Sequence, residues 1–490
     1  MNTVLIAIVV IPLVSTIVTW WTPLQASRVV TVASGFAVFV LSLTLVPSAT
    51  SHTFLAAGPA LRADALSVVF LVPTTFLYAT TAIFSVGYLH PPSGDAGKRY
   101  TRHFYAGLNA FCWAMAVAPI VNGLALLWVA IEVTTVVSAL LVAIDDTDGA
   151  TEAAWKYVLL ASLGLGIALL ATIVMYYAGT RVFGSSYDLS YPQLLAEAHR
   201  FPKDVVRLAD ILAVVGFGTK MGLVPVHTWL PDAHSEAPTP ISALLSGALL
   251  ATSFYAILRF FQVSMRCLGP TYPRNVLLAF GLASLVLAAL YLLSQRDLKR
   301  LLAYSSIEHM GILAIGMSFS APIAIVGVLL HVIAHGTAKG TAFFGAGSVV
   351  RKFKTKDLLR IRGGVALLPW SGPMFVLAVL GLSAMPPFGI FRSEFLIVSG
   401  GLSDPHDAVA AILVVLVTLA FFGLSWFTTE TMLTPAPAML TARLKRGETS
   451  RFIVVAMVLG LVALTVIGVH VPGQLSDLLH HAASELEVTR

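Results

Sequence analysis

The stretch GFGTKMGLVPVHTWLPDAHSEAPTPISALLSG (residues 216–247) is apolar enough at its two ends to lie in lipid, but its helical pattern is interrupted. Gly216, Gly218, Gly222 and Pro225 fall where a continuous helix would need residues with good helix propensity and a free backbone N–H. The stretch therefore predicts a membrane helix that breaks partway across the bilayer.

A second stretch, LAVLGLSAMPPFGIFRSEFLI (377–397), is interrupted in the same way by Met385-Pro386-Pro387 and Gly389. Two interrupted spans at matching places in two halves of a chain are typical of inverted repeats with an ion site near the membrane midplane. We therefore expect two repeats, each containing one broken helix.

The composition around these stretches is that of a membrane protein. Hydrophobic residues make up 57% of the chain and charged residues only 11%, whereas soluble domains carry about 25% charged residues. About fourteen runs are long enough to span a bilayer as helices, and they are too long and continuous for barrel strands. The runs lie near 3–21, 29–47, 64–89, 103–121, 123–144, 153–178, 205–224, 241–263, 275–294, 301–319, 322–350, 366–385, 407–428 and 452–470.

The runs predict an all-α polytopic membrane protein with two inverted five-helix repeats, in which helices 7 and 12 are the broken ones. The longest polar loop, 179–204, has room for one short surface helix, and the tail after residue 471 is short and mixed in charge. The expected division is 1–101 for helices 1–3, 102–264 for the first repeat, 265–430 for the second, and 431–490 for helix 14 and the tail.

Basic residues predict the orientation. With the N-terminus outside, the inside loops hold eighteen Lys and Arg, among them the run RKFKTKDLLRIR (351–362) and Arg443, and the outside loops hold ten. The positive-inside rule then places both termini on the outer side of the cell membrane. No basic run is interleaved with aromatic residues, so we expect no nucleic-acid partner.

Cys112 and Cys267 are the only cysteines, and they form no CxxC motif. The chain therefore cannot by itself ligate a four-cysteine iron–sulfur cluster or a zinc ribbon. The sequence also has no HExxH, Walker A or dinucleotide-binding motif. We expect a chain without cofactor or metal that does not itself catalyse redox chemistry.

Four ionisable residues, Glu132, Lys220, Lys339 and Glu394, fall within apolar runs. Each costs about 2.5–3.5 kcal/mol at the bilayer centre on insertion scales, or on the order of 10 kcal/mol together. Such groups persist when they are paired, hydrated or functional. Lys220, at the break of span 7, is predicted to pair with Glu132 and to be held by free carbonyls and water; a snorkelling lysine and a purely structural ion pair are the alternatives.

His331, His335 and Lys339 follow one another at steps of four in LLHVIAHGTAKGTAFFGAG (329–347). On a helix they form a column about 12 Å long, which with intervening water can pass a proton. Two histidines on one helix face cannot ligate opposite sides of one haem iron, although a partner histidine from another span could; hydrogen-bonded core histidines are the remaining alternative. Gly336 and Gly340 predict a close helix contact that shields the column from lipid.

Further candidates lie near these groups. Glu394 is either an exit carboxylate or a boundary salt bridge with Arg392, and Glu308 and His309 start span 10, where helix ends tolerate charge. The remaining candidates are predicted in a loop, where they line an aqueous funnel or cap span 8: His227, Asp232, His234 and Glu236.

Four segments that carry these residues lie between about residues 64 and 400, in the order AIEVTT, TKMGLVPVHTWLPDAHSEAP, QRDLKRLLAYSSIEHMG and HVIAHGTAKG. In them the chain resembles the antiporter-like subunits of respiratory complex I, Mrp-type cation/proton antiporters and membrane-bound nickel–iron hydrogenases. AAWKY (153–157), MPPFGIFRSEF (385–395) and the short C-terminus most resemble the F-type subunit of hydrogenase-4 and formate hydrogenlyase.

The resemblance implies that Glu132 and Lys220 are a coupled pair, that the column from His331 to Lys339 is the central axis, and that Glu394 is the terminal relay. It further implies a proton-translocating, non-catalytic subunit driven by partner subunits that carry nickel–iron and iron–sulfur centres, in exchange for Na⁺ or without it. In the stretch of span 8 where many relatives carry His or Lys, SALLSGALLATS (242–253), the chain offers only Ser246, Thr252 and Ser253. Alternative functions are a stand-alone or Mrp-type antiporter, a complex I subunit and an inert anchor for a redox arm.

Overall fold

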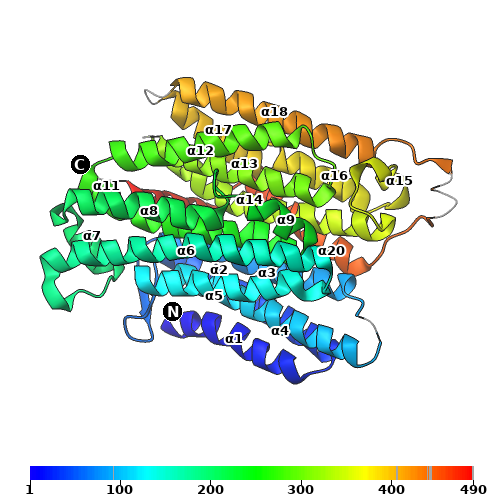
Figure 1. The fold of residues 1–490 in the computed structure, drawn as a ribbon, viewed down its shortest axis with the longest axis horizontal. Coiled ribbons are helices and arrows are strands. Elements are labelled where there is room, and N and C mark those ends of the chain that lie inside the picture. Colours follow the sequence, from blue (N-terminus) through cyan, green and yellow to red (C-terminus); the bar gives the residue numbers. More distant parts are fainter. Residues whose placement is uncertain (92, 320, 404–406, 439, 441–443, 488–490) are drawn as a thin grey trace.

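The computed structural model describes the chain except residues 92, 320, 404–406, 439, 441–443 and 488–490, so Arg443 of the predicted basic set lies outside the described residues. Most helices run along one direction, and both chain termini lie toward the same end of the bundle (Figure 1). We call this end the terminal face and the other end the opposite face. Among the described residues, the strands are a single antiparallel pair, β1 (Phe54–Ala56) and β2 (Leu61–Ala63).

The helices before the first break are α1 (Asn2–Trp21), α2 (Leu24–Ala49), α3 (Ala65–Tyr88), α4 (Asp95–Val117), η1 (Ala118–Ile120), α5 (Leu124–Val142), η2 (Ala143–Asp145), α6 (Asp148–Phe183), η3 (Gly184–Ser186), α7 (Tyr191–Glu197), η4 (Ala198–Arg200) and α8 (Lys203–Met221). Those between the two breaks are α9 (Trp229–Glu236), α10 (Thr239–Leu244), η5 (Leu245–Leu249), α11 (Leu250–Leu268), α12 (Thr271–Leu292), α13 (Leu298–Ser318), α14 (Pro322–Phe353), η6 (Leu358–Arg360), α15 (Gly364–Leu367) and α16 (Ser371–Leu382). The last are α17 (Gly389–Leu402), α18 (Asp407–Met432), α20 (Arg451–Val469) and α21 (Gly473–Leu486).

The helical membrane fold is confirmed. Ten helices of the described chain are long and apolar enough to cross a bilayer. Their outer sides expose large apolar residues, such as Leu140 on α5 (71% exposed) and Trp426 on α18 (70% exposed), as expected for surfaces that contact lipid. The count of fourteen spans, the inverted repeats and the division into 1–101, 102–264, 265–430 and 431–490 stay predictions.

The two predicted interruptions are present. Helix α8 ends at Met221, and Gly222 follows with φ +87°, a left-handed conformation that a side chain would strain. Helix α16 ends at Leu382, and α17 begins only at Gly389. A third irregularity was not predicted: a π-helical turn, η5, lies between α10 and α11.

The tail after residue 471 differs from the prediction because it forms α21, which packs into the bundle against α2, α3, α11 and α14. Helix α20 ends beside the break between α16 and α17, where a Cβ on Gly468 would clash with the carbonyl oxygen of Pro387. From there α21 continues to the terminal face, and Glu485 accepts hydrogen bonds from the N–H groups of Ala65 and Leu66 at the start of α3. Helices α20 and α21 therefore form one interrupted pair.

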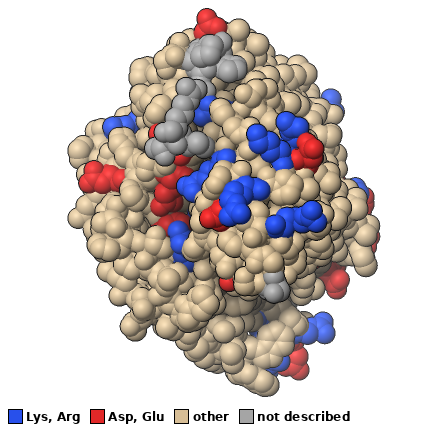
Figure 2. Space-filling model, turned by 90° about the vertical axis from the view of Figure 1, so that its left-hand side faces the viewer, with Lys and Arg blue, Asp and Glu red and all other residues tan. Residues whose placement is uncertain are grey.

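The predicted inside loops meet at the opposite face. Arg351, at the end of α14, donates to the carbonyl of Gly87 at the end of α3 (2.7 Å), and Lys356 forms an ion pair with Glu236 (2.5 Å). Figure 2 shows the other end of the molecule, the terminal face, on which charged side chains lie both near the middle and along the rim. Both ends of the bundle therefore carry charged side chains.

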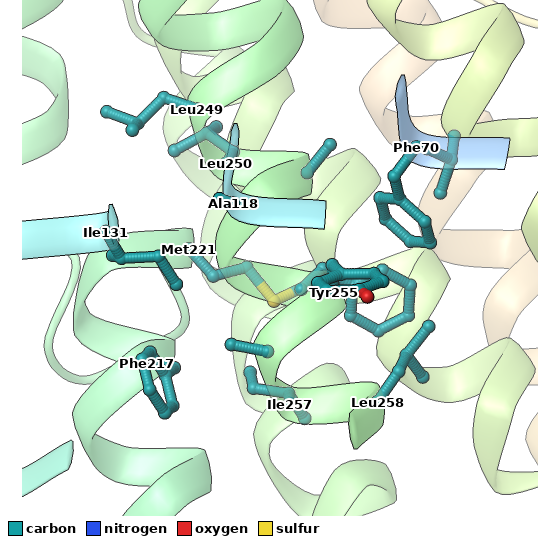
Figure 3. Close-up of a cluster of buried hydrophobic side chains, with 14 of the residues drawn as sticks. Phe70, Ala118, Ile131, Phe217, Met221, Leu249, Leu250, Tyr255, Ile257 and Leu258 are labelled. Carbon is teal, nitrogen blue, oxygen red and sulfur yellow. The ribbon is translucent and has the colours of Figure 1, made fainter. Parts of the chain in front are cut away.

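The core between α3, α8 and α11 is apolar, and Figure 3 shows Phe70, Met221 and Tyr255 within one cluster. At the terminal end of this cluster Arg259 is fully buried and donates to both carboxylate oxygens of Asp64, at 2.6 and 2.8 Å. Asp64 also caps α3 by accepting the N–H of Ser67 (2.9 Å). The ion pair therefore ties α11 to the start of α3.

We expect Asp64→Ala to lower the free energy of unfolding by about 3–5 kcal/mol, because it leaves Arg259 buried and unpaired. The thermal denaturation midpoint of the purified protein in detergent measures the loss. The matched control is Arg62→Gln, since Arg62 contacts Asp64 at 3.3 Å near the surface and should contribute about 1 kcal/mol or less. Equal midpoints for the two variants would contradict the assignment.

Candidate functional site

Lys220 lies in the last turn of α8 and is fully buried. Its ammonium donates to the hydroxyl of Thr135 on α5 (2.8 Å) and to that of Tyr157 on α6. The Tyr157 hydroxyl lies 2.7 Å from Ser138 Oγ, so a hydroxyl chain leads away from the lysine. We call Lys220, Thr135, Ser138 and Tyr157 the first cluster.

Glu132 lies beside the first cluster but forms no ion pair with Lys220 in the described structure, so the predicted direct pairing is absent. The predicted carbonyl shell is also replaced by hydroxyls, because the freed carbonyl of Thr219 accepts the indole N–H of Trp229 (2.7 Å). Glu132 is partly exposed, and its charge still acts on Lys220. The two groups are thus neighbours without a direct ion pair, and their coupling stays a prediction.

The predicted column on α14 is fully buried. The rings of His331 and His335 stack with centroids 6.3 Å apart. Lys339 turns toward α13, where it donates to the carbonyl of Leu302 (2.8 Å) and to the hydroxyl of Ser305. Like Lys220, this lysine is held by neutral oxygen atoms.

His309 on α13, named with Glu308 as a further candidate from the sequence, completes the column. Its ring centroid lies 5.1 Å from those of both His331 and His335, and its Nδ1 lies 3.1 Å from His331 Nε2. The same Nδ1 is 3.9 Å from Glu394 Oε1, and His331 Nδ1 is 2.9 Å from Ser393 Oγ. A row of polar groups therefore connects α14 and α13 to α17.

The sequence predicted Glu308 at a helix end, and this prediction was wrong. Glu308 lies in the middle of α13 and is only 3% exposed. Its Oε2 has no hydrogen-bond partner in the described part of the chain. Its charge acts on Lys339, as that of Glu132 acts on Lys220. The two lysines thus have similar surroundings.

His309, His331 and Glu394 are also the group of described residues with ligand atoms close enough for a metal ion, all within 4.8 Å of one another. The 3.1 Å spacing of the two histidine nitrogens equally suits a hydrogen bond between the rings. The group can therefore hold and transfer protons without an ion.

The close contact predicted for α14 is present. A Cβ on Gly336 would lie 2.9 Å from the carbonyl oxygen of Gly247 in η5, and one on Gly340 would clash with the side chain of Leu77 on α3. The backbones of the two helices touch beside His335, which excludes lipid from the column.

The residues predicted in a loop lie on or beside α9. Asp232 forms ion pairs with Arg300 (2.6 Å) and Lys156 (3.3 Å), and Glu236 forms one with Lys356. These two carboxylates therefore link α9 to neighbouring segments at the opposite face. His227 precedes the helix, and its Nδ1 has no partner among the described atoms.

His234 points into the bundle instead. It is fully buried, its Nδ1 lies 2.8 Å from the carbonyl oxygen of Leu230, and its Nε2 has no partner in the described chain. Its ring lies 6.1 Å from that of Trp229, beside the first cluster, and 6.0 Å from that of Phe343 on α14. The charge of Lys339 acts on it. His234 thus lies between the first cluster and Lys339.

Near Lys339, a hydroxyl of span 8 contacts a neighbouring helix. Ser246, in η5, lies 2.7 Å from Ser306, the neighbour of the Ser305 that holds Lys339. Thr252 and Ser253 donate to carbonyls of their own helix. The span therefore carries no ionisable link of its own between the two lysines.

Among the described residues Glu394 and Arg392 form no salt bridge, so that alternative is not realised, and the two side chains line different cavities. Glu394 lines a cavity of about 410 Å³ between α17 and α18 whose other lining is almost entirely apolar. Arg392 lines a second cavity, of about 590 Å³, between α14, α17 and α21.

Comparison with known proteins gives a consistent assignment. The family profile described as NADH:quinone oxidoreductase/Mrp antiporter, TM, matches residues 121–464. A hydrogenase-4 component F homolog of Methylacidiphilum infernorum is 36% identical over 365 residues, which cover 72% of this chain and 75% of the relative. These matches confirm the resemblance read from the sequence motifs.

Two solved structures share the fold. A chain of the membrane-bound sulfane sulfur reductase, an archaeal respiratory membrane complex, superposes with a TM-score of 0.85 at 19% identity, covering 99% of this chain and 98% of that one. A chain of respiratory complex I from Thermus thermophilus gives 0.82 at 22% identity, covering 99% of both. Both structures are of multi-subunit membrane complexes.

We expect Gly336→Ala to destabilise the protein by about 1–3 kcal/mol, because the added methyl group meets the backbone of Gly247. The matched control is Gly166→Ala on α6, where a Cβ would contact nothing within 4 Å. Thermal denaturation of the two purified variants in the same detergent measures the difference. A Gly336→Ala protein as stable as Gly166→Ala would contradict the close contact.

Proposed function

The chain belongs to the NADH:quinone oxidoreductase/Mrp antiporter family of membrane subunits, and we propose that it translocates protons within a hydrogenase-4-like respiratory complex. The relative that is 36% identical, a hydrogenase-4 component F homolog, supports the assignment to this kind of complex. Membership of a larger membrane complex is supported by the two structural neighbours.

The observation that carries the proposal is the row of buried polar groups from Lys220 to Glu394. Ionisable groups inside a membrane protein mark ion pathways because their burial is costly. Here the buried ionisable groups lie on α8, α9, α14, α13 and α17. The order that we propose for the row is Lys220, His234, Lys339, Glu308, His309, His331 and Glu394, with His335 beside His309.

The link between the two halves of the row is His234, not a residue of span 8. Its Nδ1 is engaged by a backbone carbonyl oxygen, and its free Nε2 can exchange a proton with water on either side. A water molecule needs two to four polar partners in a buried site, and the Tyr157, Ser246 and Ser306 hydroxyls supply such partners near the two lysines.

Redox chemistry in partner subunits, which carry the nickel–iron and iron–sulfur centres, drives the movement. A shift of charge at Glu132 and Lys220 changes the proton affinity of the groups further along the row. This chain is then a coupling element and not a catalyst. The basic loops at the opposite face support an orientation with that face inside the cell and the terminal face outside.

We expect Lys220→Ala to reduce proton pumping by about a hundredfold, the scale of a lost proton-transfer group, while hydrogen chemistry in the partner subunits continues. The measurement is acidification of the interior of inverted membrane vesicles that contain the complex. The nickel and iron content of the gently solubilised complex is determined in parallel. Lys203→Ala, at the exposed first turn of the same helix, is the matched control. Normal pumping by Lys220→Ala would refute the proposed function.

We expect His234→Leu to fold and assemble but to pump about tenfold more slowly, because it removes the proton acceptor between the two lysines. Leucine fills most of the buried volume without offering a ring nitrogen. The same vesicle assay compares it with His199→Leu on the exposed turn η4. If both variants pump equally well, protons do not pass through His234.

A further inference from the structure

Helix α21 carries a polar stripe. Ser476, His480 and Ser484 follow at steps of four, and Glu487 comes three residues later, directly after the helix. Residues at this spacing share one helix face. The apolar residues Leu478, Ala482 and Leu486 lie on the buried side that packs into the bundle. One face of α21 is therefore built for a polar environment.

This stripe lines the cavity of about 590 Å³ between α14, α17 and α21. On α14 the cavity extends from Pro322, the first residue of the helix, to Leu330, a distance of about 12 Å along the helix. Because Pro322 lies at the terminal face, the cavity reaches from that face into the membrane. We call it the α21 groove.

Arg392 lies in the first turn of α17, about 15 Å along the helix from its end at Leu402. It lines the inner part of the α21 groove, is partly exposed, and has no hydrogen bond or ion pair with any described residue. A guanidinium stays charged, and an unpaired charge at this depth is stable only if water solvates it. Arg392 therefore indicates that water enters the groove.

The inner end of the groove approaches the proton row along two helices. Leu330 and Arg392 line the groove, and they are followed in sequence by the row residue His331 and by its contact Ser393, which are both fully buried and do not line it. His331 Nδ1 lies 2.9 Å from Ser393 Oγ. The groove thus ends one residue along each helix from this buried contact, and a proton must cross that step to enter it.

The other cavity that reaches the relay is a poor conductor by comparison. Apart from Glu394, the polar side chains that line it are Ser383 and Thr418, both of which donate to carbonyls of their own helices. Water is not held in an apolar cavity that lacks polar partners. The α21 groove is lined by Arg392, Ser476, His480 and Glu487 as well as by Ser484, whose hydroxyl donates to the carbonyl of His481.

We propose that the α21 groove is a water-filled half-channel that joins His331 and Ser393 to the terminal face, with His480 as a proton acceptor along its wall. The proton leaves a ring nitrogen of His331, is carried by water, and binds the ring of His480 before it passes to bulk solvent. This inference rests on the proposed function and adds the outlet to it. Helix α21 is then part of the pathway and not an inert tail.

Thiol labelling tests whether the groove holds water, independently of pumping. In the intact complex, with Cys112 and Cys267 replaced by alanine, Ser476→Cys should react with a charged, membrane-impermeant methanethiosulfonate about tenfold faster than Val415→Cys, a 60%-exposed position on the apolar outer side of α18. Equal, slow labelling would mean that lipid or a partner helix fills the groove, and it would overturn the proposal.

Pumping tests whether protons use the groove. His480→Leu should slow vesicle acidification about tenfold, whereas His481→Leu, one residue away and outside the groove lining, should not. Rapid labelling of Ser476→Cys together with normal pumping by His480→Leu would overturn the outlet while leaving the row from Lys220 to Glu394 intact. Normal pumping by Lys220→Ala would instead refute the proposed function and leave the labelling result standing.

Discussion

The structure depends on how Lys220 and Lys339 are satisfied inside the membrane. Each ammonium donates to a pair of neutral oxygen atoms, Thr135 and Tyr157 in one case and Leu302 and Ser305 in the other. Hydrogen bonds of this kind offset part of the cost of burial without supplying a counter-charge. The carboxylates that act on the two lysines, Glu132 and Glu308, remain separate from them. Each lysine can therefore lose its proton without leaving a broken ion pair behind.

The breaks in the helices place these groups. The turn after Met221 lets α9 fold back into the bundle, which brings Trp229 to the first cluster and His234 toward Lys339. The break before Gly389 lets α17 present Ser393 and Glu394 to the histidines of α13 and α14. A continuous helix at either break would place these side chains away from the row. Interrupted backbone is tolerated at this depth only where protein covers it, and here neighbouring helices do so.

Much of this could be predicted from the sequence because it depends on local pattern. Apolar runs fix the helices, Gly and Pro fix the interruptions at 222 and 383–388, and steps of four fix the column on α14. The predictions that failed concerned contacts between side chains of different helices. No local sequence pattern indicates that the indole N–H of Trp229 donates to the carbonyl of Thr219. The predicted carbonyl shell around Lys220 was therefore wrong, and hydroxyls hold the ammonium instead. His309 was recognisable only as a neighbour of Glu308. Helix α21 left a readable signal in Leu478, Leu479, Ala482, Ala483 and Leu486, whose helical spacing was hidden by the mixed charge of the tail.

The buried charge of Arg259 contrasts with the groups of the row. Arg259 is held by both oxygens of Asp64, by Tyr255 and by Gln262, and it cannot deprotonate under physiological conditions. That arrangement fixes charge in one place and suits a joint between α3 and α11. The row from Lys220 to Glu394 uses the opposite composition, with amines and imidazoles that can change charge, carboxylates at a distance, and ring nitrogens on His234, His309 and His335 without partners in the described chain. Unsatisfied buried nitrogens lower stability, so their concentration along one line, away from the Arg259 joint, is explained by groups that must accept and release protons.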